Sequence, residues 1–162
     1  PTNNNLYLNT SDSKQADGVM LGGNSTTVSI SASSAVNTNN GSYIAYNFTS
    51  IAGYSKIGSY TGTGATGNVQ YVGFEPAFVM VKATSTSEPW FILDNKRDPN
   101  NPRDNRLMPD STAAESNGSV HTMNFNSNNF TLNGTVGNGT NGSGQTYIFL
   151  AIKWNEWQKE TF

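Results

Sequence analysis

The stretch Phe78-Val79-Met80-Val81-Lys82 carries the clearest strand signal in the sequence. Successive side chains of a strand point to opposite faces of its sheet, so Val79 and Val81 share one face while Phe78, Met80 and Lys82 share the other. Both faces are apolar for most of the run. The stretch therefore predicts a strand that is buried on both sides.

Similar short runs recur along the chain, rich in β-branched and aromatic residues and separated by clusters of Gly, Asn, Ser and Thr. This pattern is typical of strands and turns. Asn-Gly pairs, which favour tight turns, lie at 40–41, 117–118, 133–134 and 141–142, and several are expected to close hairpins. Further strands are expected at Tyr43–Phe48, Val69–Phe74, Trp90–Leu93, Val120–Phe125, Phe130–Leu132 and Tyr147–Lys153.

The spacing of these runs, about ten residues, predicts an all-β protein built as a sandwich or a barrel, and we expect an antiparallel β-sandwich. Only Ser111–Ser116 is a helix candidate, with Asp110 as its N-cap. A chain of 162 residues is long enough for one domain with a sizeable core, or for one domain and part of a second.

The composition is polar but weakly charged. Charged residues make up 12% of the chain, whereas Asn, Ser, Thr and Gly together make up roughly 46%. Aromatic residues at 11% and a net charge of -2 argue against a disordered charged tail. A pI of about 5.2 and nine scattered Lys and Arg argue against nucleic-acid binding.

Several kinds of site are excluded by residue counts. The sequence contains no cysteine and a single histidine, His121, so neither a disulfide framework nor a thiolate or imidazole zinc site is expected. We expect no cofactor and no metal. No apolar run approaches the roughly 20 residues that a membrane helix needs, so no membrane insertion is expected.

An internal repeat is the most informative feature of the chain. Residues 39–46 and 141–151 both consist of an Asn/Gly/Ser turn that leads into an aromatic and aliphatic strand, and the two stretches lie about 100 residues apart. We therefore predict that residues 1–50 are the C-terminal half of a preceding β unit or a β extension, that 51–153 form a complete unit, and that 154–162 are a tail or linker. With Pro1 at its start, the chain is expected to be part of a longer polypeptide of tandem units.

Two ordered stretches carry a family resemblance. Residues 53–64 (Gly-Tyr-Ser-Lys-Ile-Gly-Ser-Tyr-Thr-Gly-Thr-Gly) and 71–82 (Tyr-Val-Gly-Phe-Glu-Pro-Ala-Phe-Val-Met-Val-Lys) are followed by Trp90–Pro99, Ala113–Glu115, Asn129–Leu132 and Gln145–Ile148. Over residues 40–153 this order resembles a recurrent domain of tailed-bacteriophage virion proteins, found in tail fibres and other appendages. The first 38 residues match it less well.

The resemblance implies a concanavalin-like jelly-roll sandwich in tandem units, with a structural or adhesive role and no catalytic residues. It implies a location in the virion, outside the cell. Its expected partners are other copies of the chain, other virion proteins and host-surface glycans, in a symmetric assembly such as a trimeric fibre or a capsid array.

The loop from Asp94 to Asp110 holds a large share of the charges. Asp94, Arg97 and Asp98 are candidate ligand-binding residues, because carboxylates suit Ca²⁺ and Arg suits anionic sugars. The loop lacks EF-hand spacing, and Arg to Asp pairs together with three prolines favour a rigid surface loop instead. Arg97 and Asp94 favour that structural interpretation.

No catalytic constellation stands out in the sequence, so we do not expect an enzyme. No Glu-x-Asp-x-Glu strand supports glycoside hydrolysis, and no Gly-x-Ser-x-Gly elbow accompanies His121. Trp90 is a candidate for sugar stacking, although its place within a strand favours the core. Trp154 and Trp157 are candidates for contacts between subunits.

Two other classes of protein remain open. A carbohydrate-binding module of a secreted enzyme would be a folded monomer with a glycan groove. A self-assembling bacterial surface or filament subunit would instead donate a strand to an open sheet edge of its neighbour.

Overall fold

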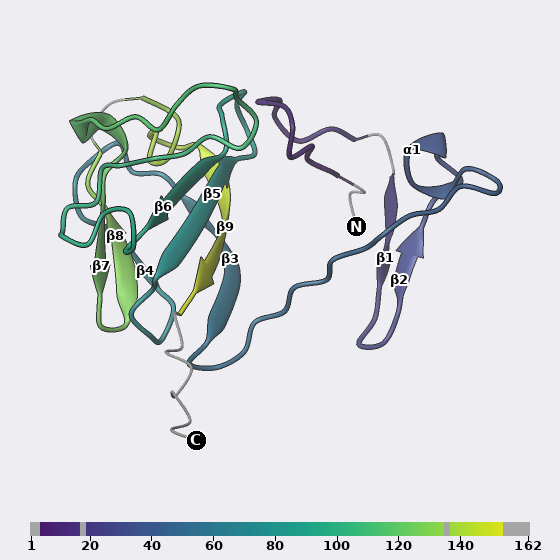
Figure 1. Cartoon of the computed structure of the whole chain (residues 1–162), viewed down its shortest axis with the longest axis horizontal. Coiled ribbons are helices and arrows are strands. Elements are labelled where there is room, and N and C mark those ends of the chain that lie inside the picture. The colour runs from purple at the N-terminus through teal and green to yellow at the C-terminus, as the bar shows by residue number, and fades with distance from the viewer. Residues whose placement is uncertain (1–3, 17–18, 135–136, 154–162) are drawn as a thin grey trace, which may run out of the picture.

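The computed structural model describes residues 4–16, 19–134 and 137–153, and it shows an all-β protein with antiparallel sheets and almost no helix (Figure 1). The α-helix α1 and the 3-10 helix η1 are one turn each. In chain order the elements are β1 Met20–Gly23, β2 Val28–Ile30, α1 Ser34–Asn37, β3 Ser55–Thr61, β4 Asn68–Tyr71, β5 Phe78–Ala83, β6 Phe91–Asp94, η1 Ser119–His121, β7 Met123–Asn126, β8 Asn129–Leu132 and β9 Thr146–Ile152.

Two sheets form the main body, residues 51–153. A four-stranded sheet has the order β3-β9-β5-β6, and a three-stranded sheet has the order β4-β8-β7. The strand β9 is central, since it pairs with β3 from Ser55↔Ile152 to Thr61↔Thr146 and with β5 from Phe78↔Ile152 to Ala83↔Tyr147. The first and last strands of the body therefore lie side by side.

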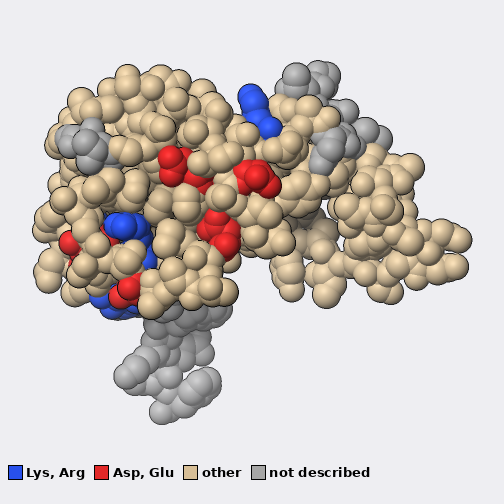
Figure 2. All heavy atoms as spheres, turned by 90° about the horizontal axis from the view of Figure 1, so that it is seen from above, with Lys and Arg blue, Asp and Glu red and all other residues tan. Residues whose placement is uncertain are grey.

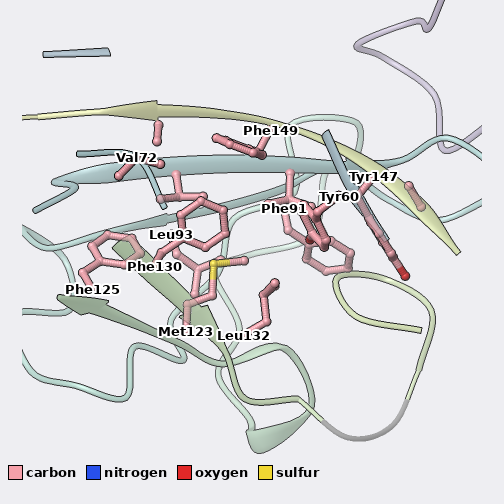
Figure 3. Packing of buried hydrophobic residues seen from close by; sticks show 14 of the residues in the cluster. Tyr60, Val72, Phe91, Leu93, Met123, Phe125, Phe130, Leu132, Tyr147 and Phe149 are labelled. Carbon is pink, nitrogen blue, oxygen red and sulfur yellow. The ribbon is translucent and has the colours of Figure 1, made fainter. Parts of the chain in front are cut away.

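The core lies between these two sheets (Figure 3). The four-stranded sheet contributes Val79 and Val81, as their alternation predicts, together with Tyr147 and Phe149 from β9. The other sheet contributes side chains including Met123, Phe125, Phe130 and Leu132, all at most 2% exposed. Aromatic rings meet edge to face, with Phe130 and Phe149 centroids 5.1 Å apart, a geometry that adds to the free energy of burial.

The remaining strands lie outside the body. β1 and β2 form a separate hairpin, which with α1 stands apart from the two sheets in Figure 1. A long stretch without secondary structure connects α1 to the body. We call residues 19–50, from this hairpin to the end of the connection, the arm. That residues 1–50 are half of a preceding unit stays a prediction.

Strand expectations within the body agree with the structure to within a few residues, with one exception at Val120–Phe125. There η1 occupies residues 119–121 and β7 begins only at Met123. Two further expectations are wrong. Residues 43–48 form no strand, since no described strand pairs with them. Residues 111–116 form no helix, and the Asp110 carboxylate instead accepts a hydrogen bond from the Trp90 backbone N–H at 3.2 Å.

The Asn-Gly pairs do not close the hairpins. Residues 127–128 connect β7 to β8, and residues 24–27 connect β1 to β2. At the second turn the Asn24 side-chain oxygen accepts hydrogen bonds from the N–H groups of Thr26 and Thr27, which fixes the turn locally. The strands β1, β2 and β3 were not predicted.

The loops at one end of the body are held by a buried amide, Asn141. Its Oδ1 accepts from the Thr63 N–H at 3.0 Å and from Asn68 Nδ2 at 2.8 Å, while its Nδ2 donates to the carbonyls of Ala65 and Gly134. A side chain at Gly62 would collide with the Gly142 carbonyl, so glycine permits this close approach of two loops. The polar composition thus replaces apolar packing at this end.

Replacing Asn141 by Ala leaves two carbonyls without the amide that donates to them, and two N–H groups without the oxygen that accepts from them. Unsatisfied buried polar groups are costly, so we expect a loss of about 2–4 kcal/mol in the free energy of unfolding, measured by urea denaturation. The exposed Asn100→Ala is the matched control and should cost less than about 0.5 kcal/mol. Equal stability of the two variants would contradict the role of Asn141.

Candidate functional site

The outer face of the four-stranded sheet, opposite the core, is apolar. Cross-strand partners share a face, and Ile57↔Leu150, Leu150↔Met80 and Met80↔Ile92 are all direct partners. An apolar row therefore crosses all four strands. Ile57 and Ile148 remain exposed on this face.

A hollow of about 190 Å³ lies over the centre of this outer face. Ile57, Met80, Ile148 and Leu150 line it from the sheet, and Trp90 lines it from the entrance of β6. Phe48 from the arm also lines the hollow, although its side chain stays 63% exposed. The hollow suits an apolar group and offers no side chain for acid-base or metal chemistry.

Residues 4–16 cover another part of the outer face. Lys82, which is fully buried, donates from Nζ to the carbonyls of Ser11, Ala83 and Glu88 at 2.8–3.1 Å. The Lys14 N–H donates to the Thr84 carbonyl at 3.1 Å. Burial lowers the pKa of Lys82 below its ordinary value, and the carboxylates of Asp110, Asp12 and Glu88 oppose that shift. A buried ammonium therefore fastens the N-terminal segment to β5.

Trp90 takes part in the same attachment. Its indole Nε1 donates to the Tyr7 carbonyl at 2.9 Å, and the residue is 8% exposed. A ring in this position has its polar atom already satisfied and little free face for a sugar. The sequence candidate for stacking thus lies beneath the N-terminal segment.

Among the residues that the structure describes, the arm carries many exposed apolar side chains. Ile44 is 81% exposed, Tyr46 is 80% exposed and Tyr43 is half exposed. Val28 and Ile30 on β2 are exposed as well. Several large apolar side chains are thus exposed within one segment, and large exposed apolar patches are typical of interaction sites.

The charged loop uses its candidate ligand-binding residues internally. Asp94 accepts from the N–H groups of Lys96 and Arg97 and from Arg97 Nε at 2.6 Å, and Arg97 also pairs with Glu115. Burial raises the pKa of Asp94, but the hydrogen bonds and charge of Arg97 outweigh it, so the pKa lies below its ordinary value. Asp98 accepts from the N–H groups of Asp104 and Asn105.

The same loop covers two sheet edges. Leu107 pairs with Ile92 on the open edge of β6. On the edge of β7, the Asn101 amide binds both the N–H and the carbonyl of Phe125 at 2.9 Å, and Arg103 pairs with Met123 while its guanidinium lies 4.4 Å from the Phe125 ring centroid. The structure thus brings Asp94 and Arg97 together as a loop clamp. The Asp98 backbone N–H donates to the Asp94 carbonyl at 3.3 Å, while its carboxylate binds the N–H groups of Asp104 and Asn105.

His121 is partly buried beside an aromatic ring. Its ring is 4.5 Å from that of Phe91, centroid to centroid, and its Nδ1 lies 3.5 Å from the Thr140 hydroxyl. Burial, helped by the nearby Arg106 charge, lowers its pKa to about 4. Burial and the Arg106 charge account for this shift and no carboxylate contributes to it, so the ring lacks the orienting acid of a catalytic triad.

Two further observations concern the described residues alone. Within residues 4–16, 19–134 and 137–153 no group of three His, Asp or Glu side chains is placed to hold a metal ion. No helix in this part of the chain is long and apolar enough to cross a membrane. Trp154 and Trp157, the candidates for subunit contacts, lie outside the described residues.

Sequence reasoning missed the apolar outer face and the arm as a site. One signal was available: between Asp17 and Lys56 the sequence contains no Asp, Glu, Lys, Arg or His. Natural proteins protect free strand edges with charges, and this stretch has none.

The fold and this surface define an all-β domain with an exposed apolar face. The chain belongs to the family described as "Domain of unknown function (DUF7483)", whose model matches residues 1–156. No curated protein matches the chain significantly, and neither does any solved structure.

Lys82→Met should release the N-terminal segment, because the carbonyls of Ser11 and Glu88 lose a charged donor. We expect the Lys14 amide to exchange with solvent about tenfold faster or more, since hydrogen bonds to charged groups are worth about 1.5–3 kcal/mol. Hydrogen exchange measures this directly. The exposed Lys56→Met is the control, and unchanged exchange at Lys14 in the Lys82 variant would contradict the attachment.

Acid should destabilise the protein through His121. The folded pKa of about 4 lies below the ordinary 6.5, so the unfolded chain binds a proton first and stability falls from about pH 6.5 to pH 4. Between pH 6.5 and pH 4 the free energy of unfolding should fall less in His121→Gln than in the natural chain. After allowance for solvent screening we expect a difference on the order of 1–3 kcal/mol.

The single imidazole gives an unambiguous NMR titration as the second measurement. A titration midpoint near 6.5 in the folded protein would contradict the burial of this ring.

Proposed function

We propose that this domain is a structural subunit of a tailed-phage virion, in a tail fibre, another appendage or a capsid decoration, and that it assembles with copies of itself outside the cell. The proposal includes a jelly-roll, concanavalin-like arrangement for the two-sheet body. It combines the resemblance of residues 40–153 to virion domains with the surface of the molecule.

One observation carries the proposal, namely that apolar surface remains uncovered on both the arm and the outer sheet face. Ile44 and Tyr46 are about four-fifths exposed, and Ile57 and Ile148 are exposed on the sheet. When another chain covers exposed apolar side chains, the complex is stabilised by roughly 25 cal/mol for each Å² of apolar surface buried. A subunit of an assembly explains this surface better than an isolated domain does.

The polar residues also support a structural role. Asp94, Arg97 and Asp98 hold their own loop. Asn141 binds backbone groups of the loops and the first side chain of β4, and Lys82 binds a carbonyl of the N-terminal segment. The hydrogen bonds of these side chains are made within the chain and make its loops rigid. Rigidity is the property that an appendage needs in order to transmit force and to display a surface.

A second candidate is a self-assembling bacterial surface or filament subunit. The stretch Tyr43–Phe48 favours it, because this stretch has strand-forming side chains and no partner strand among the described residues. Donation of such a stretch to a neighbour would give an open polymer rather than a closed particle.

Light scattering at several concentrations tests the proposal. The monomer mass is 17.4 kDa, and we expect a stable trimer or a larger closed assembly. Growth without limit as concentration rises would favour the filament subunit. A folded monomer at every concentration would overturn self-assembly and favour a carbohydrate-binding module, to be tested next on a glycan array.

A further inference from the structure

The arm presents three alternate apolar residues, Ile44, Tyr46 and Phe48. In an extended chain such residues lie on one side. Phe48 lines the hollow on the outer face of the four-stranded sheet in the same chain, together with Ile57 and Met80. Tyr46 and Ile44, which precede Phe48 in the arm, are about four-fifths exposed. The apolar contact that Phe48 begins is therefore left incomplete within one chain.

The arm also lacks the means to be stable alone. A two-stranded hairpin is marginal in water, and among the described strands β1 and β2 pair only with each other. Val28 and Ile30 are exposed on it. The lobe that holds β1, β2 and α1 shows no charged side chain in Figure 2, whereas the charged residues gather over the rest of the molecule. Such a lobe gains stability by contact with another apolar surface.

A matching surface exists on the chain itself. The row Ile57, Leu150, Met80 and Ile92 crosses the outer face, and the hollow above it is only partly covered by Phe48. We propose that Ile44 and Tyr46 of one copy pack on this outer face in a second copy, beside the second copy's own Phe48. This inference rests on the proposed self-assembly and names the surfaces that carry it.

A second copy is the occupant that the surface favours. The arm has no charge with which to select an acidic or basic partner, and the net charge of -2 gives copies little repulsion. One chain supplies both the apolar arm and the apolar face, so contact between copies covers both. The contact continues one that the chain already makes through Phe48.

A pair of matched double variants tests the contact. Ile44→Thr with Tyr46→Thr removes the exposed pair on the arm and should weaken self-association at least about a hundredfold. Val69→Thr with Tyr71→Thr changes a similar exposed alternate pair on β4, which lies in the other sheet, and should leave association unchanged. Analytical ultracentrifugation measures both, and far-UV circular dichroism checks folding.

Cross-linking locates the second surface. Because the sequence has no cysteine, a single substitution gives one reactive thiol per chain. Mixing Ile44→Cys chains with Ile57→Cys chains and adding a short bismaleimide should give heterodimers, which can form only between copies. Mixing Tyr71→Cys chains with Ile57→Cys chains should give at least about tenfold fewer, and equal yields would overturn the docking on the outer face.

These outcomes separate the inference from the proposed function. A natural chain that assembles, with an arm variant that assembles equally well, would overturn the inference and leave self-assembly standing. A natural chain that stays monomeric would overturn both. Loss of assembly in the arm variant alone, together with the heterodimer cross-link, supports the inference.

Discussion

The pairing of β9 on both sides along its whole length is the constraint on which the rest of the structure depends. β9 lies between β3 and β5 and pairs with both. The last strand of the body is thereby paired with its first strand, β3. Tyr147 and Phe149 face the core, while Ile148 and Leu150 face outward. A single strand therefore organises both the packed interior and the apolar outer face. Any change that weakened its pairing would alter the core and the candidate interface together.

The polar composition and the apolar surface have complementary roles. At the loop end of the body, Asn141, Tyr60 and Tyr147 hold the backbone by hydrogen bonds, and the Tyr60 hydroxyl donates to the Thr140 carbonyl at 2.5 Å. Amide and hydroxyl groups can satisfy buried backbone there without introducing charge. The exposed apolar residues lie elsewhere, on the arm and the outer sheet face. Loop order and the exposed apolar surface thus depend on different residues.

The sequence predicts the body well where a strand carries its own signal, as at Phe78–Lys82 and Tyr147–Lys153. It does not predict β3, because Ser, Gly and Lys weaken the pattern and the pairing with β9 supplies the order. At Tyr43–Phe48 the propensity is present and the partner is missing, so propensity alone misleads. For the site, charge drew attention to Asp94 and Arg97, which hold their own loop. The outer face escaped notice, since alternation shows two apolar faces but not which one stays uncovered.

Asn141 is also a residue at which this protein can age chemically, by hydrolysis of the side-chain amide. It precedes Gly142, and asparagine is among the thermolabile residues. Hydrolysis of its side-chain amide to a carboxylate would keep the acceptors for Thr63 and Asn68 but would remove the donor to Ala65 and Gly134. Two carbonyls would then face a buried negative charge. The long-term integrity of this loop end therefore depends on how well burial shields one amide from water.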